Sequence, residues 1–326
     1  SAARPDDHIT RAPQSDGGPG FVDVLASRFG TVVTETVAGP LGASVSARWL
    51  HDTGGEVPTA YIECAQACGL HQLGGGPTPR TAMAADTRGV GQLVSAALAR
   101  GAGRIVVGLG GSATTDGGSG LVEALGGTTQ AAARLRDIDL VAASDVENPL
   151  LGPLGAAAVF GPQKGADDVT VARLEERMTQ WSRVLSSMAG RDISGDAGAG
   201  AAGGLGAALL ALGARRVSGA TLVAEATDLA TDVAAADLVI TGEGKFDAQT
   251  LRGKVVSALH GAAAAAGART VVLAGQVTLP ADEIAAAGIA SAHAVADIAG
   301  SVEVAMNDAA VQLARLAESV AGQWAA

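Results

Sequence analysis

The residue types that could do chemistry are concentrated in short glycine-rich loops that follow apolar runs. In the loop from 108 to 118, Gly111 is followed by the hydroxyls of Ser112 and Thr114 and by the carboxylate of Asp116. Glycine lets an anion approach backbone N–H groups, and a carboxylate can hold a metal ion or accept a proton. The spacing fits neither GxxxxGK[ST] nor GxGxxG, and a tight turn with hydroxyl capping is the plainer alternative.

A second polar loop runs from Thr241 to Thr250 and carries Glu243 and Asp247. It follows an apolar, β-branched run that is typical of a buried strand. Three ionisable groups and two hydroxyls are more than a turn needs. Because Mg²⁺ prefers carboxylate oxygen, these two acids could hold that ion, or one of them could take the proton of a hydroxyl group.

Three further loops carry one or two candidate groups each. Asp145 is suited to bind a metal ion or a substrate hydroxyl, together with the nearby Asn148, although an Asx turn before Pro149 would explain the same pattern. Lys164 lies on a glycine-flanked loop and could bind a phosphate or carboxylate as a point charge, and a solvated surface lysine is the alternative. Asp16 precedes a pair of glycines, the same pattern of an acid before two glycines as at Asp116.

The charge balance narrows the classes of partner. The chain has 22 Lys and Arg against 33 Asp and Glu, a formal net charge of −11, so it offers no basic surface for DNA or RNA. An anionic substrate would have to be held by local devices such as backbone amides, helix N-termini, a few basic side chains or a bound metal ion. The five histidines and two cysteines show no metal-ligand spacing. We expect two buried thiols in a reducing compartment.

The elements that must position these loops follow an α/β pattern. Strand-like runs occur at 31–38, 104–109, 237–241 and 270–274, and helical patterns separate or follow them, among them 87–100, 168–189 and 302–323. This alternation predicts parallel sheets covered by helices, with ligands at the carboxyl ends of the strands. A length of 326 residues predicts two domains. We find no long apolar run and no signal-peptide pattern, so the expected location is cytoplasmic and away from membranes.

At these loops the sequence resembles the bacterial glycerate kinase family, over nearly the whole chain from Pro13 onward. Runs similar to those of the family, in the same order, lie at 110–118, 144–152, 160–166, 198–206 and 238–250. The resemblance implies an α/β fold of two domains. One would be a Rossmann-like parallel-sheet domain built from both chain ends, residues 1–60 and 235–326. The other would be an α/β domain inserted between them at 61–234, and the active site would lie in the cleft.

The resemblance also implies an activity, namely transfer of a phosphoryl group from ATP, with Mg²⁺, to D-glycerate to give 2-phosphoglycerate. Carried over position by position, it makes Asp116, Lys164 and Asp247 catalytic and Asp145 and Glu243 metal ligands. The substrate- or nucleotide-binding positions would be Asp16, Gly111, Ser112, Thr114, Asn148 and Thr250. The expected partner is a small hydroxy acid, with no nucleic acid and no membrane, and a homodimer is compatible with the pattern.

The chain departs from the family pattern at three positions near these loops. Pro19 stands where the family has an acid, Thr115 where it has Asn, and Arg88 where it has Tyr. Two alternatives therefore stay open. One is a kinase for another small hydroxy acid or polyol, with Arg88 supplying a contact. The other is a non-catalytic relative that binds a nucleotide or metabolite, which the retained charged residues oppose.

Overall fold

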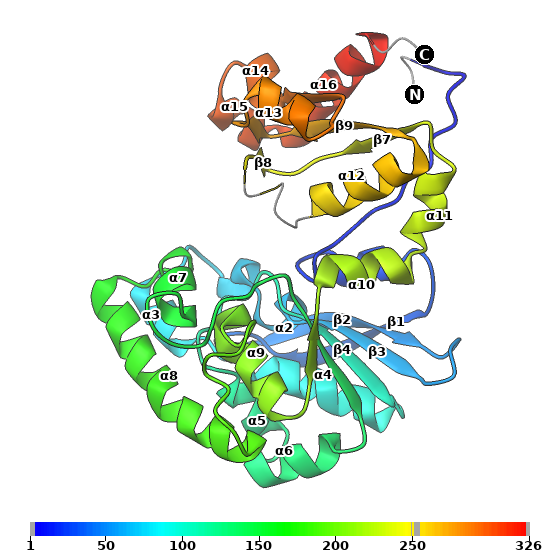
Figure 1. Cartoon of the computed structure of the whole chain (residues 1–326). Helices are drawn as coiled ribbons and strands as arrows, with labels where there is room; N and C mark the ends of the chain where they lie inside the picture. Colours follow the sequence, from blue (N-terminus) through cyan, green and yellow to red (C-terminus); the bar gives the residue numbers. More distant parts are fainter. Residues whose placement is uncertain (1–3, 249, 251–254, 324–326) are drawn as a thin grey trace. The chain divides into compact units, whose positions relative to one another are not determined.

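The computed structural model describes residues 4–248, 250 and 255–323 (Figure 1). They form two compact units of mixed α/β structure, one from residues 14–226 and one from both ends of the chain, 4–13 and 227–323. This is the expected two-domain layout with different boundaries. Residues 14–60 were expected in the terminal domain, but their strands pair with those of the larger unit.

The larger unit is built on a six-stranded sheet whose strands follow one another in chain order. The first three strands are antiparallel, and the third to the sixth are parallel. The antiparallel part was not predicted. It arises because the connection after residue 38 is a tight turn at Pro40–Gly42, too short for the crossover that parallel strands need. The strands are β1 (Thr31–Ala38), β2 (Ser44–Asp52), β3 (Thr59–Glu63), β4 (Arg104–Gly108), β5 (Asp139–Ala143) and β6 (Arg215–Val217).

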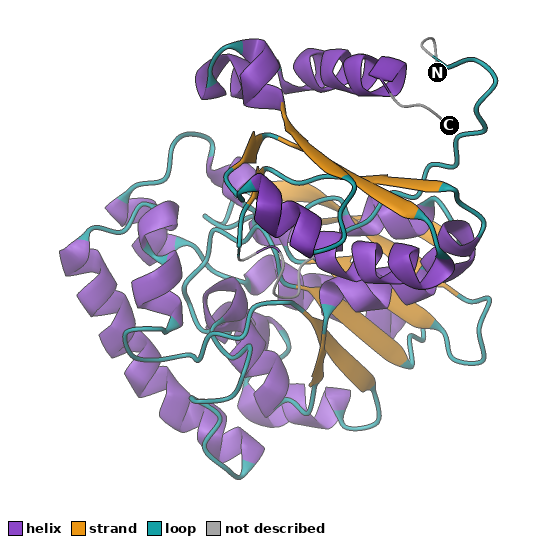
Figure 2. Ribbon diagram, turned by 45° about the horizontal axis from the view of Figure 1, so that its top comes forward, coloured by secondary structure: helices purple, strands orange, loops and turns teal. Residues whose placement is uncertain are grey.

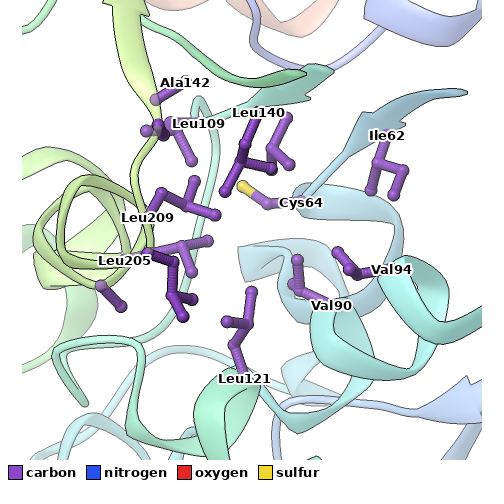
Figure 3. Packing of buried hydrophobic residues seen from close by; sticks show 14 of the residues in the cluster. Ile62, Cys64, Val90, Val94, Leu109, Leu121, Leu140, Ala142, Leu205 and Leu209 are labelled. Carbon is purple, nitrogen blue, oxygen red and sulfur yellow. The ribbon is translucent and has the colours of Figure 1, made fainter. Parts of the chain in front are cut away.

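Helices cover both faces of this sheet, as Figure 2 shows by colour. Alternate strand residues point to opposite faces, so Ile105 and Val107 belong to one buried cluster while Val106 belongs to another. In Figure 3 the sulfur of Cys64 lies among the apolar side chains of the first cluster, in keeping with a buried thiol. The α-helices of this unit are α1 (Phe21–Ala26), α2 (Ala65–Cys68), α3 (Pro79–Ala84), α4 (Arg88–Ala99), α5 (Ser119–Ala124), α6 (Thr128–Leu135), α7 (Ala156–Phe160), α8 (Asp168–Ala189), α9 (Ala201–Ala211) and α10 (Gly219–Ala226).

Two short 3₁₀ helices complete the larger unit, η1 (Leu70–Leu73) and η2 (Pro162–Lys164). The second of these carries Lys164 immediately before α8. The helix predicted at 168–189 is confirmed over its full length. An aspartate at its N-cap, Asp167, accepts the amide of Thr170 at 2.8 Å, and Gly190 ends it with φ +69°.

The terminal unit has a smaller sheet in which three parallel strands lie in the order β11–β9–β7. Val272 and Ala274 of the central strand face one buried cluster, and Val271 and Leu273 face the other. The strands are β7 (Leu238–Thr241), β9 (Arg269–Ala274) and β11 (Ser291–Ala294), with the short parallel pair β8 (Lys245–Phe246) and β10 (Gln276–Val277). The helices are α11 (Leu229–Ala234), α12 (Val255–Ala266), α13 (Ala281–Ala286), α14 (Val295–Ala299), α15 (Val302–Asn307) and α16 (Ala309–Gln323). Over the described part of the chain, we find no helix with the length and apolar character needed to cross a membrane.

Candidate functional site

In the larger unit, the loop 15–20 lies directly against the carboxyl ends of β4 and β5. The amide of Gly110 donates to the carbonyl of Gly17 at 3.0 Å. A Cβ on Gly110 would lie 2.3 Å from the Cα of Gly18, and one on Gly17 would lie 2.7 Å from the carbonyl oxygen of Ala143. Side chains would not fit at these contacts, so the glycines allow two loops far apart in sequence to form one surface.

The predicted residues Asp16, Gly111 and Asp145 are exposed at this edge of the sheet. Asp16 accepts the amide of Gly18 at 3.0 Å, and a Cβ on Gly219 would lie 2.0 Å from the carbonyl oxygen of Asp16. Asp145 accepts the amide of Ala220, in the first turn of α10, at 3.2 Å. Both acids therefore flank the start of α10, and each keeps an exposed carboxylate at the strand ends.

Asn148 follows the same strand as Asp145 but makes a different set of contacts. Its side-chain amide donates to the carbonyl of Leu154 at 2.9 Å, and its own carbonyl accepts the amide of Gly200 at 2.9 Å. These bonds tie the loop after β5 to the glycine-rich run 198–206. The predicted role of Asn148 in binding substrate or nucleotide stays a prediction.

Asp116 is buried, with 4% of its surface exposed, and its carboxylate is surrounded by donors. One oxygen accepts the amide and hydroxyl of Thr87 at 3.0 and 2.8 Å and the amide of Gly120 at 3.0 Å. The other accepts the amide of Gly118 at 3.1 Å. The carboxylate thus fixes its loop to the starts of α4 and α5. This arrangement favours a structural function for Asp116. The catalytic role expected for this carboxylate stays a prediction.

Ser112 and Thr114 lie in the same buried layer. Their hydroxyl oxygens are 2.8 Å apart, and the Ser112 hydroxyl accepts the amide of Thr114 at 3.0 Å. Behind them runs a tight turn in which Ala202, Gly203 and Gly204 all have positive φ. A Cβ on Gly203 would lie 1.8 Å from the carbonyl oxygen of Thr114. The two hydroxyls therefore order the loop from within and are not presented to solvent.

Lys164 is buried as well, with 3% exposed, and its ammonium group donates to the carbonyl of Thr114 at 2.6 Å. Burial lowers its pKa to about 8, while nearby Cys68, Cys64 and Asp116 act in the opposite direction. The solvated surface lysine that the sequence left open is therefore wrong for this structure. The ammonium group instead binds the backbone of the loop at Thr114.

Three residues that the sequence did not single out help to build this layer: Glu63, Thr87 and Arg177. Glu63, at the end of β3, accepts the amides of Gly20 and Val22 at 3.0 and 3.4 Å, and burial raises the pKa of its carboxyl group. Arg177 donates to the carbonyls of Met83, at 2.8 Å, and Thr115.

Helical spacing could have identified Arg177. It lies three residues after Leu174 and four before Trp181, so the apolar face of α8 includes this arginine.

In the terminal unit, the polar loop after β7 carries the other predicted residues. Lys245 and Asp247 form an ion pair at 3.5 Å. Thr250 is buried, and its amide donates to the carbonyl of Asp247 at 3.0 Å while its hydroxyl accepts the Asp247 amide at 3.3 Å. A Cβ on Gly242 would lie 2.1 Å from the carbonyl oxygen of Leu273, at the end of β9. The loop is thus held at the carboxyl end of the sheet, as expected from the sequence.

Comparison with known sequences decides the family. The sequence model of the glycerate kinase family matches residues 1–131 and 127–325. The chain belongs to the glycerate kinase family. It is therefore an enzyme of that family, and the loops described above are those of a glycerate kinase fold.

Named relatives cover most of the chain. It is 37% identical to the glycerate kinase of Bacillus subtilis over 95% of its length and 87% of that protein, and 34% identical to the glycerate 2-kinase of Escherichia coli over 98% and 90%. A Mycobacterium tuberculosis protein of unassigned function is 56% identical over 98% of this chain and 84% of that protein. A crystal structure from Salmonella typhimurium LT2, assigned as glycerate kinase 2, has a TM-score of 0.70 at 34% identity and covers 90% of this chain and 82% of that one.

Glycerate kinases, like other kinases, imply a divalent metal ion, and the residues that the structure describes include a carboxylate oxygen suited to hold it. No group of three or more His, Cys, Asp or Glu side chains that could hold a metal ion occurs within the part of the chain that the structure describes. Magnesium does not require such a cage, because it is commonly held by one or two carboxylates and by substrate phosphates. Glu243 has a buried carboxylate oxygen without a hydrogen-bond partner in the described structure. That orphaned oxygen fits a metal ligand.

The three departures from the glycerate kinase pattern have distinct surroundings. A Cβ on Gly111 would lie 2.7 Å from Pro19, so the proline packs on the exposed end of the loop. Thr115 is fully buried, and its hydroxyl has no partner among the described residues. Arg88 pairs with Glu123 at 2.9 Å. In this structure its guanidinium is therefore engaged by an acid of α5.

Proposed function

We propose that the chain transfers the γ-phosphoryl group of ATP to the C2 hydroxyl of D-glycerate, giving 2-phosphoglycerate and ADP. In this reaction the glycerate oxygen forms a bond to the γ-phosphorus, the bond from that phosphorus to the bridging oxygen breaks, and the hydroxyl proton passes to a base. The observation that carries the proposal is the family match along the whole chain, with named glycerate kinases at 34% and 37% identity.

Each unit contributes groups suited to part of this reaction. In the terminal unit, Glu243 would hold Mg²⁺ through its unpartnered oxygen, and Asp247 would accept the hydroxyl proton. When bound, the ion neutralises charge on the phosphate oxygens. In the larger unit, the exposed Gly111 after β4 allows an anion to reach backbone amides, and Asp16 and Asp145 are placed to bind a hydroxyl group or the metal ion.

A different acceptor is the second candidate, and Pro19 is the observation that favours it. This proline lies on Gly111, at the exposed part of the site, where the family has an acid. It removes a charged group and adds apolar surface. A small hydroxy acid or polyol that makes less use of hydrogen bonds there would be the better substrate.

The test is an ADP-release assay with Mg-ATP and D-glycerate, L-glycerate, glycerol, lactate or no acceptor. We expect turnover that depends on D-glycerate, and ³¹P NMR of the product should show a phosphate on C2. Turnover with another acceptor would replace glycerate as the substrate. ATP binding with no acceptor-dependent turnover would contradict glycerate phosphorylation and would mean that the substrate has changed or that catalysis has been lost.

A variant in the terminal unit tests the assignment of the base. Asp247→Asn should remove most turnover, by about 100-fold or more, because the amide cannot accept the proton. Asp282→Asn, an exposed acid on α13, is the matched control and should behave like the wild type. Near-normal kcat for Asp247→Asn with a wild-type melting curve would overturn the assignment.

A further inference from the structure

Donors on η2 and α8 bind three of the four carbonyls of the loop 114–117. Lys164 donates to the carbonyl of Thr114 at 2.6 Å, Arg177 to that of Thr115, and the indole of Trp181 to that of Gly117 at 2.9 Å. Arg177 and Trp181 lie one turn apart on α8. The helix and the 3₁₀ turn before it therefore hold this loop at three positions.

Arg177 also connects the loop to a second segment. Its other terminal nitrogen donates to the carbonyl of Met83 at 2.8 Å, near the end of α3. Four residues later, Thr87 donates its amide and hydroxyl to Asp116. The segments 83–87 and 114–118 are thus joined twice, once by a guanidinium between two carbonyls and once by a carboxylate between several donors.

We propose that Arg177 is a positioning residue for turnover, which together with Lys164 fixes the backbone of the loop 114–117 and places positive charge beneath it. The inference rests on the proposed phosphoryl transfer. The loop leads from Gly111, at the exposed edge of the site, to the start of α5. An error in its path would therefore displace the exposed backbone that is proposed to face the anionic substrates.

Hydrogen bonds between Arg177 and the two carbonyls would not by themselves require a charged side chain. No carboxylate among the described residues forms an ion pair with it, and its Nε atom is buried without a partner. Burial lowers its pKa, against the opposing influence of Asp116. Keeping a guanidinium in such a place is unfavourable. In a chain of net charge −11, two cations behind the same loop outnumber the buried carboxylate of Asp116 there, and the excess positive charge favours an anion.

The peptide geometry gives the loop a direction. In a trans peptide the N–H points opposite to the C=O. Because the carbonyls of Thr114 and Thr115 point to cations, the amides of Thr115 and Asp116 point away from them. Neither amide has an acceptor within the described ranges. This orientation is costly for the free loop, and the two cations are the contacts that hold it.

The experiment compares three variants on α8 in the full chain. Arg177→Met removes both the charge and the donors. Arg177→Lys keeps the charge but has no planar fork, so it can reach one carbonyl and not both. Arg183→Met, an exposed arginine of the same helix, is the matched control. Steady-state kinetics with Mg-ATP and D-glycerate are combined with hydrogen exchange of the segments 83–87 and 109–120.

We expect kcat of Arg177→Met to fall by about 10- to 100-fold, because small errors in the positions of reacting groups are costly, with exchange faster in both segments and unchanged in β4. Arg177→Lys should lie between this variant and the wild type, and Arg183→Met should stay within about twofold of it. A purely structural role would lower the melting temperature of Arg177→Met but leave kcat and KM like those of the control, and would overturn the proposal.

The hydrogen-exchange measurement keeps this proposal separate from the proposed function. If the wild type does not phosphorylate glycerate, the assignment of function fails, while the exchange of 109–120 still shows whether Arg177 holds the loop. Unchanged exchange in Arg177→Met would refute the positioning role whatever the activity. If Arg177→Met does not fold, Arg177→Lys gives the same two readouts.

Discussion

At the scale of single residues, the layer beneath the exposed edge consists of charged groups that bind backbone rather than one another. Asp116 binds amides and a hydroxyl, Glu63 binds two amides, and Lys164 binds a carbonyl. Charged groups make stronger hydrogen bonds than neutral ones, so each of these side chains fixes the path of the backbone that it binds. Burying these charged side chains is unfavourable, and this free-energy penalty offsets part of the stability gained by ordering the loops.

For Lys164, the free-energy penalty of burial can be measured from the pH dependence of stability. Its pKa is about 8 in the folded chain and near its ordinary value of 10.5 when unfolded. Between these values the folded state has released a proton that the unfolded state still binds, so stability rises with pH. Relative to Lys164→Met, the wild type should gain roughly 3 kcal/mol of unfolding free energy from pH 8 to 10.5. Urea titrations of both proteins across this range would measure the difference.

Subtracting the variant cancels the other groups that titrate there, such as Tyr61, whose pKa is raised by burial. A difference that stays flat with pH would show that Lys164 is solvated in the folded chain. The sequence singled out this lysine as a candidate site residue, and that role stays a prediction. The sequence could not show that the side chain is buried, because burial depends on the helices and loops that pack around η2.

At the scale of the elements, close backbone contacts explain why glycine recurs in the site loops. The turn Ala202–Gly204 passes so near Thr114 that position 203 has room only for glycine. At position 202 the chain has an alanine, although its φ of +50° is a value that favours glycine. A left-handed conformation is unfavourable for alanine. The strain is consistent with a turn whose path is fixed by the neighbouring loop.

Two substitutions in this turn should have opposite effects. Gly203→Ala would place a Cβ 1.8 Å from the Thr114 carbonyl oxygen and should cost about 3 kcal/mol or more, because backbone on both sides must move. Ala202→Gly relieves the positive φ and should stabilise the fold by up to about 1 kcal/mol. Urea unfolding at pH 7 gives both values. Equal destabilisation by the two changes would contradict this account of the turn.

The elements also show what the sequence could predict. The strand at 31–38 and the helix at 168–189 have the predicted bounds, because their patterns are long and periodic. The predicted helix 302–323 is broken into α15 and α16 at Asp308, whose φ/ψ values lie outside the helical region. The antiparallel strands were missed although the short turn at Pro40–Gly42 is a local signal of a hairpin. The boundary after Pro13 was missed because it depends on the pairing of β3 with the distant β4, which no local pattern records.

At the scale of the whole molecule, the two units have separate hydrophobic clusters. The terminal unit is the smaller and has three main strands. It also has several large apolar side chains exposed on its last helices, among them Met306 at 75% and Val311 at 46%. It therefore gains less from apolar burial, and we expect it to be the less stable unit.

Calorimetry without ligands should accordingly show two transitions. Hydrogen exchange at temperatures between them should find the terminal unit open and the six-stranded sheet protected, because each unit has its own core. One transition, with all peptides opening together, would show that the chain unfolds as a single cooperative unit.

The contact between Gly17 and Gly110 has a consequence for synthesis of the chain on the ribosome. Residues 15–20 leave the ribosome before the backbone they pack against, since Gly110 follows about ninety residues later and Ala143 later still. Because chains emerge at roughly 5–20 residues per second, this first segment must wait for several seconds before its partners exist. Glu63, which binds the same segment, emerges in that interval and offers it the earliest long-range contact in this part of the site.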